Sequence, residues 1–422
     1  MQSVNLSRML KALYEIEAQE GKRVTLLGIG PMSLPVIRAS FELAKEKDFP
    51  IMFIASRNQV DAKELGGGYV CNWDQKGFYR AIEEIAREVD FNGLYYTCRD
   101  HGGPWQRDNE RAMALDEKAA MDLGKQSYLV DLISGFDLLH IDPTKDPHEK
   151  GIVPMEKVIS RTVELIQYVE DERNKLQLPE IGYEVGTEET NGGLTTIESY
   201  EAFIRMLADE LQARALPLPN FIVGQTGTLT RLVENVGHFN ASIAESLSAT
   251  ARKYGVGLKE HNADYLSDRI LLEHPILGIT AANVAPEFGV VETRAYLELA
   301  ALEEKQCQSG KLKKGSNVSA TLRREAVTCE RWRKWMVGEL ATVAIDTVLS
   351  DEKLTGFITE ICGHYTFDMP EVKQEIQCMF RNLEDLGMRP QYYVKDCLKR
   401  SLDRYVSCLN LEGLTSALLQ KL

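Results

Sequence analysis

The sequence predicts a (β/α)8 barrel followed by a helical C-terminal extension. Eight short apolar runs alternate with amphipathic helical segments over residues 24–305, which is typical of parallel strands joined by helical crossovers. Eight such units are the number that closes a parallel barrel. An open nucleotide-binding sheet is the alternative, but no GxGxxG motif opens a helix after a strand, and Gly28 with Gly30 is only a weak trace of one.

Each predicted strand is a short apolar run bounded by glycine, proline or polar residues. We place the strands at residues 24–30, 50–55, 94–98, 136–142, 180–186, 220–226, 256–261 and 276–283. An amphipathic helix over residues 5–20 precedes them and ends at Gly21. The helical segments that follow the strands are expected at residues 34–47, 78–89, 107–124 with a second run through 132, 153–176, 197–213, 239–254, 266–273 and 286–305.

The regular alternation stops near residue 305. A polar, basic stretch at residues 309–317 is followed by helical runs from residue 340 to the end, without strand periodicity. We therefore predict two parts, a barrel domain with its N-terminal helix (1–305) and a helical extension (306–422) that packs on the barrel or on a partner chain. Trp332 and Trp335 are interpreted as core or interface residues of this extension.

Composition narrows the classes of partner. The net charge is −14, which disfavours binding to a nucleic-acid backbone. No apolar run reaches the roughly 18–20 residues of a membrane span, and the N-terminus begins an amphipathic helix rather than a signal peptide. The eight cysteines are scattered without a CxxC pair, which favours free thiols in a reducing cytoplasm.

Polar residues follow the predicted strands, at the end of a barrel where active sites lie. The third strand ends in Asp100 and His101 before a Gly-Gly-Pro turn. The polar residues at the other strand ends are Arg57, Asn58, Asp142, Thr144, Glu184, Glu188, Gln225, Thr226, His261, Asp264, Asn283 and Glu287. Since buried polar groups must be satisfied, these converging ends predict a polar pocket for a small molecule.

His101 and His261 end two strands and, with one fifth-strand carboxylate, are candidates to hold a divalent metal. Two imidazoles and a carboxylate suit zinc or manganese, and such an ion would polarise a substrate carbonyl and stabilise an enediolate. Asp100 is the candidate acid or base. The alternative is a metal-free cluster in which Gln225 and Asp264 hydrogen-bond the imidazoles. His140, inside the fourth strand, is interpreted as a satisfied core histidine.

Several segments in this order resemble a known family. They are Ser56-Arg-Asn-Gln-Val60, Asp100-His-Gly-Gly-Pro-Trp105, His140-Ile-Asp142, Val185-Gly-Thr-Glu188 with Gly192-Gly193, Lys259-Glu-His261 with Asp264-Tyr265, and Asn283-Val-Ala285. They resemble the GatZ/KbaZ family of tagatose-bisphosphate aldolase subunits and, more distantly, the class II metal-dependent aldolases. The resemblance implies a barrel protein of carbohydrate metabolism that acts on a sugar or sugar phosphate. Some members carry an old kinase label, but the chain has no GxxxxGK[ST] phosphate loop.

The resemblance also implies roles for individual residues. Asp100 matches the proton-transferring Asp of the aldolases, His101 and His261 match zinc ligands, and Asn283 matches a substrate contact. Glu188 lies in the matching Val-Gly-Thr-Glu segment and is preferred as the third metal ligand. The remaining expected residues are Glu184 as a catalytic carboxylate and Asn58, Asp142, Thr144, Gln225 and Asp264 as substrate contacts.

The sequence departs from the aldolase pattern at two strand ends. Gln225 and Thr226 precede Gly227 where the catalytic aldolases have a histidine, so one of three expected imidazoles is missing. Residues 262–267 follow His261 in place of a Gly-rich phosphate loop, which argues against a phosphate held there by backbone N–H groups.

Two hypotheses follow. The first is a metal-dependent aldolase or epimerase for a ketose or ketose phosphate, favoured by the intact Asp100, His101 and His261. The second is a non-catalytic subunit that stabilises a separate class II aldolase subunit, favoured by the missing strand-six histidine. Its polar site would then be a relic or a sugar sensor. In either case we expect a homo-oligomer.

Overall fold

The computed structural model describes residues 4–188, 192–336 and 338–422. Eight parallel strands close a barrel in the order β1-β10-β9-β6-β5-β4-β3-β2, which confirms the predicted (β/α)8 fold. The barrel strands are β1 (Leu26–Ile29), β2 (Ile51–Ser56), β3 (Tyr95–Gly102), β4 (Leu138–Ile141), β5 (Gly182–Val185), β6 (Phe221–Val223), β9 (Gly257–Glu260) and β10 (Ala281–Val284).

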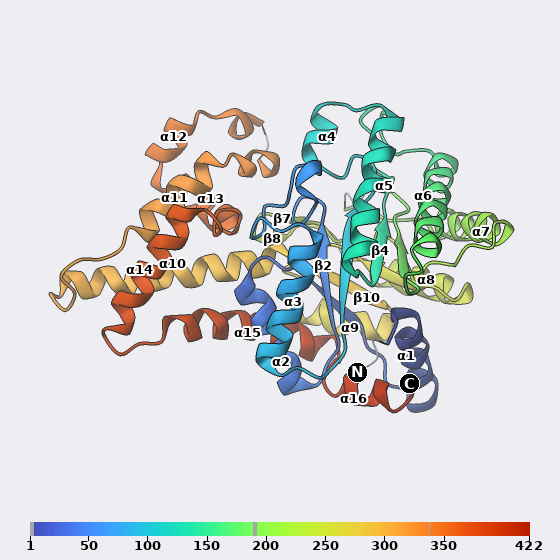
Figure 1. The fold of residues 1–422 in the computed structure, drawn as a ribbon, viewed down its shortest axis with the longest axis horizontal. Helices are drawn as coiled ribbons and strands as arrows, with labels where there is room; N and C mark the ends of the chain where they lie inside the picture. Colours follow the sequence, from blue (N-terminus) through green and yellow to red (C-terminus); the bar gives the residue numbers. More distant parts are fainter. Residues whose placement is uncertain (1–3, 189–191, 337) are drawn as a thin grey trace.

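Helices surround the barrel close to the predicted positions (Figure 1). They are α1 (Leu6–Glu20), α2 (Leu34–Lys47), α3 (Gln75–Val89), α4 (Asp108–Ala112), α5 (Glu117–Ser134), α6 (Met155–Lys175), α7 (Ile197–Ala213), α8 (Ala241–Lys253), α9 (Asp268–Leu277) and α10 (Pro286–Gln308). A short 3-10 turn, η1 (Lys63–Leu65), follows β2, and a small hairpin of β7 (Thr230–Arg231) and β8 (Glu234–Asn235) follows β6.

Two predicted boundaries differ from the structure. Two helical runs were expected, at residues 107–124 and on through 132, but the break between α4 and α5 lies earlier, because Asp116 starts α5 by accepting a hydrogen bond from the Ala119 N–H. The eighth strand was expected from residue 276 but begins at Ala281. Residues 276 and 277 instead complete α9, which Gly278 ends in the left-handed conformation (φ 79°).

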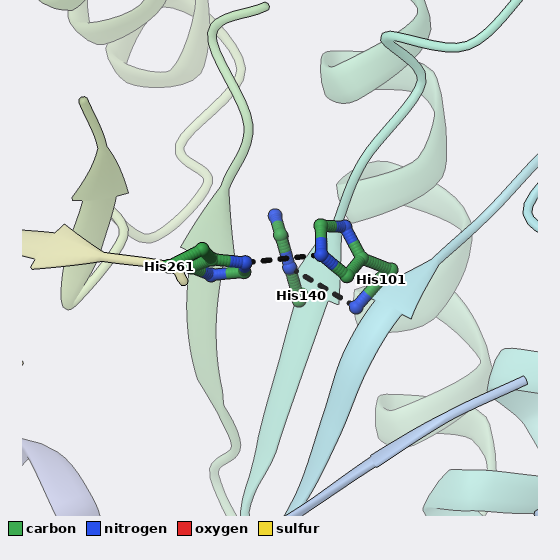
Figure 2. A group of neighbouring side chains, drawn as sticks. All are labelled: His101, His140 and His261. Atoms are coloured by element: carbon green, nitrogen blue, oxygen red, sulfur yellow. Dashed lines mark hydrogen bonds between the residues drawn. The ribbon is translucent and has the colours of Figure 1, made fainter. Parts of the chain in front are cut away.

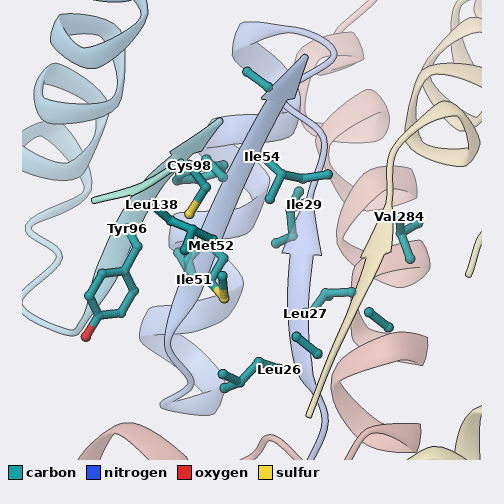
Figure 3. Close-up of a cluster of buried hydrophobic side chains, with 14 of the residues drawn as sticks. Leu26, Leu27, Ile29, Ile51, Met52, Ile54, Tyr96, Cys98, Leu138 and Val284 are labelled. Carbon is teal, nitrogen blue, oxygen red and sulfur yellow. The ribbon is translucent and has the colours of Figure 1, made fainter. Parts of the chain in front are cut away.

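The barrel strands are buried on both faces, as the helical layer requires. Figure 3 shows apolar side chains of neighbouring strands, including Leu27, Met52 and Cys98, packed in this core. The parallel register pairs Ser56 with Asp100 and Gly28 with Asn283. A Cβ on Gly28 would lie 2.2 Å from the Asn283 Oδ1 atom, so this glycine is explained by close packing beneath the site and not by nucleotide binding.

Residues after 310 are mostly helical and pack against the barrel, as the sequence predicts. The elements are α11 (Val318–Thr328), η2 (Arg331–Trp335), η3 (Gly338–Thr342), α12 (Ile345–Ser350), α13 (Glu352–Cys362), η4 (Gly363–Tyr365), α14 (Pro370–Glu384), α15 (Pro390–Cys408) and α16 (Leu414–Leu419). In Figure 1, α11 to α14 gather beside the barrel, whereas α15 and α16 return beneath it. The division at residue 305 stays a prediction, because α10 continues to Gln308 and α15 shares the core of the barrel.

The cluster α11–α13 has a small core of its own, which includes Trp332, as expected for a core residue. Leu232 and Val233 of the β7–β8 hairpin pack against this core. The loop after β6 therefore joins the extension to the carboxyl end of the barrel. Within the described part of the chain, no helix combines the length and apolar character needed to cross a membrane.

Because α15 packs against α2 and α10, we expect Leu398→Ala in α15 to lower the free energy of unfolding by about 2–5 kcal/mol. The Leu398 side chain is fully buried, so the substitution leaves a cavity. Chemical denaturation measures the loss. The control is Leu272→Ala on α9, where the leucine is 52% exposed and the same deletion is expected to have a small effect. Equal losses in the two variants would contradict the packing described here.

Candidate metal and active site

Three histidine side chains from three strands meet inside the carboxyl end of the barrel (Figure 2). His101 ends β3, His140 lies in β4, and His261 directly follows β9. One ring nitrogen of each lies within 4.8 Å of the others. The Nε2 atom of His101 is 3.0 Å from the Nδ1 atom of His261, and the His140 Nδ1 atom accepts a hydrogen bond (3.1 Å) from the backbone N–H of His101.

Local backbone strain helps to aim two of these rings. His101 has a φ of 44°, and the register between β3 and β4 shifts between Arg99 and Gly102. Asn262, next to His261, also lies in the left-handed region, with a φ of 62°. Left-handed conformations cost energy in residues other than glycine and concentrate at functional sites. An irregular strand end of this kind turns a side chain out of the regular alternation.

The outer nitrogens of two rings contact carboxylates. The Asp142 Oδ2 atom is 2.6 Å from His101 Nδ1, and the Glu184 Oε1 atom is 2.6 Å from His261 Nε2. The other Glu184 oxygen is 2.5 Å from the Lys259 ammonium nitrogen. A histidine that donates its outer N–H to a carboxylate presents the lone pair of its inner nitrogen, which is the arrangement found around metal ions.

The carboxylate contacts leave the inner nitrogens of His101 and His261 facing each other. When Nδ1 of His101 and Nε2 of His261 carry the protons, their inner nitrogens point lone pairs at each other across 3.0 Å. Two facing lone pairs repel unless the two rings share a proton or a metal ion. His140 brings a third ring nitrogen within 4.8 Å of the other two. The donor set therefore fits a divalent ion that prefers nitrogen ligands.

The charges around the rings also suit a cation. Burial would raise the pKa of Asp100, but His101, His140 and His261 hold it far below its ordinary value. Burial would also raise the pKa of Glu184, but Lys259 and His140 lower it below its ordinary value. Both carboxylates are therefore ionised at neutral pH.

The pKa values of two rings shift in opposite directions. Burial lowers the pKa of His261, which keeps this ring neutral and able to bind a metal. Burial would also lower the pKa of His140, but the neighbouring carboxylates of Glu184 and Asp100 raise it. His140 is therefore the ring at which protons compete more strongly with a metal.

The structure brings most of the predicted site residues together. Asp100 lies beside the rings, with its Oδ1 atom 3.8 Å from His261 Nδ1, and accepts a hydrogen bond (3.1 Å) from the Asn283 amide. Asp142 lies behind His101 and accepts a hydrogen bond (2.5 Å) from Thr144. Asp142 and Thr144 thus orient the His101 ring, whereas the sequence analysis expected both residues to contact substrate.

The other expected residues lie farther from the rings. Asn58 lines the cavity and donates to the Gln106 carbonyl. Asp264 also lines the cavity and accepts backbone hydrogen bonds from Ala285 and Glu287. Burial and the neighbouring Glu287 raise its pKa to about 8, so it is mostly protonated at neutral pH.

The third imidazole comes from His140, a residue that the sequence analysis assigned to the core. Glu188, the preferred third ligand, instead accepts a hydrogen bond (2.6 Å) from Thr195, and Thr195 binds the backbone of Gln225. Strand alternation could have identified His140, because it lies two residues before Asp142 and faces the same side. The same parity pairs Lys259 with His261, so the buried lysine was also a missed member of the site.

A cavity of about 530 Å³ opens above the rings. Its lining includes His101, His261, Asp100 and Asn283 from the barrel and also side chains from the C-terminal extension. This volume lies in the range of roughly 300–1,000 Å³ that is usual for small-molecule sites. The arrangement can hold a small polar molecule against a metal ion and an ionised carboxylate.

Comparisons with known proteins place these features in a family. A protein-family model described as "D-tagatose-1,6-bisphosphate aldolase subunit GatZ/KbaZ-like" matches residues 10–409. A search of curated proteins finds no match. Among solved structures, a probable tagatose 6 phosphate kinase from Sinorhizobium meliloti 1021 superposes with a TM-score of 0.73. The two sequences are 18% identical over 91% of this chain and 100% of that one.

Two further structures share the fold at lower similarity. The fructose-bisphosphate aldolase of Campylobacter jejuni is 10% identical, with a TM-score of 0.56 over 97% of this chain and 96% of its own. The fructuronate-tagaturonate epimerase UxaE of Cohnella laeviribosi is 12% identical, with a TM-score of 0.55 over 92% of this chain and 82% of its own. At these identities the likeness concerns the barrel and its helices.

Proposed function

Because the chain belongs to the GatZ/KbaZ-like family of D-tagatose-1,6-bisphosphate aldolase subunits, we propose that it is itself a metal-dependent enzyme. It cleaves or epimerises a ketose or a ketose phosphate. The observation that carries this proposal is the pair of inner nitrogens of His101 and His261, which face each other at 3.0 Å while carboxylates hold their outer nitrogens. A metal ion held by both nitrogens would satisfy the two facing lone pairs.

The metal ligands in this proposal are His101, His140 and His261, and zinc or manganese suits such a set. Glu188 stays a weaker candidate, because its carboxylate is bonded to Thr195. When bound, the ion would polarise the carbonyl of the sugar. Asp142 and Glu184 hold the two outer rings in the tautomer that binds metal.

Asp100 is the proposed base. Its carboxylate is ionised, and the Asn283 amide fixes one of its oxygens. In cleavage, Asp100 takes the proton of a substrate hydroxyl as the adjacent carbon–carbon bond breaks. The electron pair of that bond moves toward the polarised carbonyl. In epimerisation the same bond breaks and then re-forms on the other face of the new aldehyde, and Asp100 returns its proton to the aldehyde oxygen as that bond forms.

The experiment is an assay of the purified full chain, alone, with tagatose 1,6-bisphosphate for cleavage and tagaturonate for epimerisation. We expect turnover of one substrate class that chelation abolishes and that added zinc or manganese restores. Metal content is measured in parallel. A chain that holds metal and is inert alone, but that raises the activity of a separate class II aldolase subunit, would reject the proposal in favour of a stabilising subunit.

A further inference from the structure

The C-terminal extension forms one wall of the active-site cavity. We define this C-terminal wall by its cavity-lining residues: Lys334, Trp335, Ile361, His364 and Tyr365. They come from η2, the end of α13 and η4, which lie beside the carboxyl end of the barrel in Figure 1. The cavity that His101 and His261 line is thus completed by residues that lie more than 70 positions after His261.

The C-terminal wall is anchored to the barrel by aromatic and charged contacts. The ring of Tyr365 packs edge-on against Tyr69, with 4.6 Å between the ring centroids. The Arg331 guanidinium lies over both rings, at 4.6 Å and 5.1 Å from their centroids. The Lys334 ammonium nitrogen lies 3.5 Å from an Asp108 carboxylate oxygen at the start of α4. These contacts hold Lys334 at the edge of the cavity.

Three cationic side chains line this cavity: Arg111, Lys145 and Lys334. Arg111 and Lys334 share a single carboxylate, Asp108, so the group carries surplus positive charge. Lys145 has neither an ion pair nor a hydrogen-bond partner for its ammonium group anywhere in the described residues. Asp264, also at the cavity, is mostly uncharged at neutral pH. An anionic ligand would balance this charge.

His364 gives a second, independent sign of a ligand. Its side chain is 4% exposed and lines the cavity, yet neither ring nitrogen has a hydrogen-bond partner among the described residues. Burial, with Lys334 and Arg331 nearby, lowers its pKa to about 3, so the ring is neutral. A buried, unsatisfied N–H costs free energy that a ligand acceptor would recover.

We propose that the C-terminal wall binds the anionic terminal group, a phosphate or a carboxylate, of a ketose whose carbonyl lies at the three histidines. Lys334 and Arg111 contact the anion, His364 donates a hydrogen bond to it, and Lys145 adds a further positive charge to the cavity lining. This inference rests on the proposed function for the position of the carbonyl. It supplies an anion site in a chain that lacks a Gly-rich loop after the seventh strand.

The test compares three sugars with one carbon skeleton: D-tagatose, D-tagatose 6-phosphate and D-tagaturonate. Binding is measured by calorimetry on the full chain that carries Asp100→Asn, which prevents turnover. We expect at least one anionic sugar to bind about 10- to 100-fold more tightly than D-tagatose. The tighter of the two identifies the anion as phosphate or carboxylate.

The variants decide whether the C-terminal wall is responsible. Adding Lys334→Met should remove the preference for the anionic sugar over D-tagatose, whereas Lys334→Arg should preserve that preference. The matched control is Lys353→Met, an exposed lysine on α13 outside the cavity lining. The inference is overturned if no sugar binds, if all three bind equally, or if Lys334→Met and Lys353→Met behave alike.

The sugar-binding test of the C-terminal wall can succeed or fail independently of the activity assay that tests the proposed function. These isotherms need no turnover, so a chain without catalytic activity can still show the anion preference and its dependence on Lys334. Conversely, the chain could show metal-dependent turnover while Lys334→Met leaves the binding preference for anionic sugars intact. That result would overturn the role of the C-terminal wall and leave the proposed function standing.

Discussion

Replacing His261 by alanine is expected to remove the bound divalent ion and to lower activity by more than about 100-fold. Loss of a group that only orients a ligand already costs about 10- to 100-fold in metal affinity, and His261 supplies one of the two facing nitrogens itself. Elemental analysis of the purified protein gives the metal content. The control is His148→Ala, since His148 is exposed and lies outside the three-histidine group.

Metal content also distinguishes two candidates for the third ligand: His140, which the structure favours, and Glu188, which the sequence analysis preferred. A three-histidine site requires His140→Ala to lose metal and Glu188→Ala to retain it. The opposite result would restore Glu188 as the third ligand. Equal metal content in the wild type and in His261→Ala, or none in either, would reject the site altogether.

Acid should release the metal from the wild type, because only neutral imidazole binds it. We expect the affinity to fall as the pH drops below about 6. Burial lowers the pKa of His261, so this ring resists protonation to lower pH than an exposed histidine. The raised pKa of His140 works in the other direction, so His140 takes up a proton at a higher pH than His261.

Asp100→Asn is expected to lower kcat by about 100- to 10,000-fold while the bound metal is retained. The amide keeps an oxygen that can accept the Asn283 hydrogen bond, so the geometry should persist, but it cannot take a proton at neutral pH. Steady-state kinetics and metal analysis on one preparation separate these effects. The surface substitution Asp122→Asn on α5 is the control.

Two results would contradict this role for Asp100. An Asp100→Asn variant with full activity would assign the proton transfer to another group, of which Glu184 is the nearest candidate, beside His261. A variant that loses its metal would show instead that Asp100 acts as a ligand, which its 3.8 Å distance from His261 Nδ1 makes a direct alternative.

The sequence located most of this site because strand ends in a barrel share one face. Asp100, His101, His261 and Asn283 each follow a short apolar run, and the structure brings all four to one cavity. The sequence analysis interpreted His140 as core because it lies inside an apolar strand, whereas the structure places its ring beside those of His101 and His261. In a barrel the inward side of a strand near its carboxyl end faces the site, so burial alone does not separate core from ligand.

The sequence by itself determined the barrel, its strand order along the chain and the polar character of its carboxyl end. These are local properties, since the apolar runs and helical periods repeat within each unit of the chain. Only the tertiary structure decided the third imidazole, the facing nitrogens of His101 and His261, and the place of Lys334 and His364 in the cavity. These depend on ring orientation and on contacts between segments more than 200 residues apart, such as Asp108 with Lys334, which local periodicity does not encode.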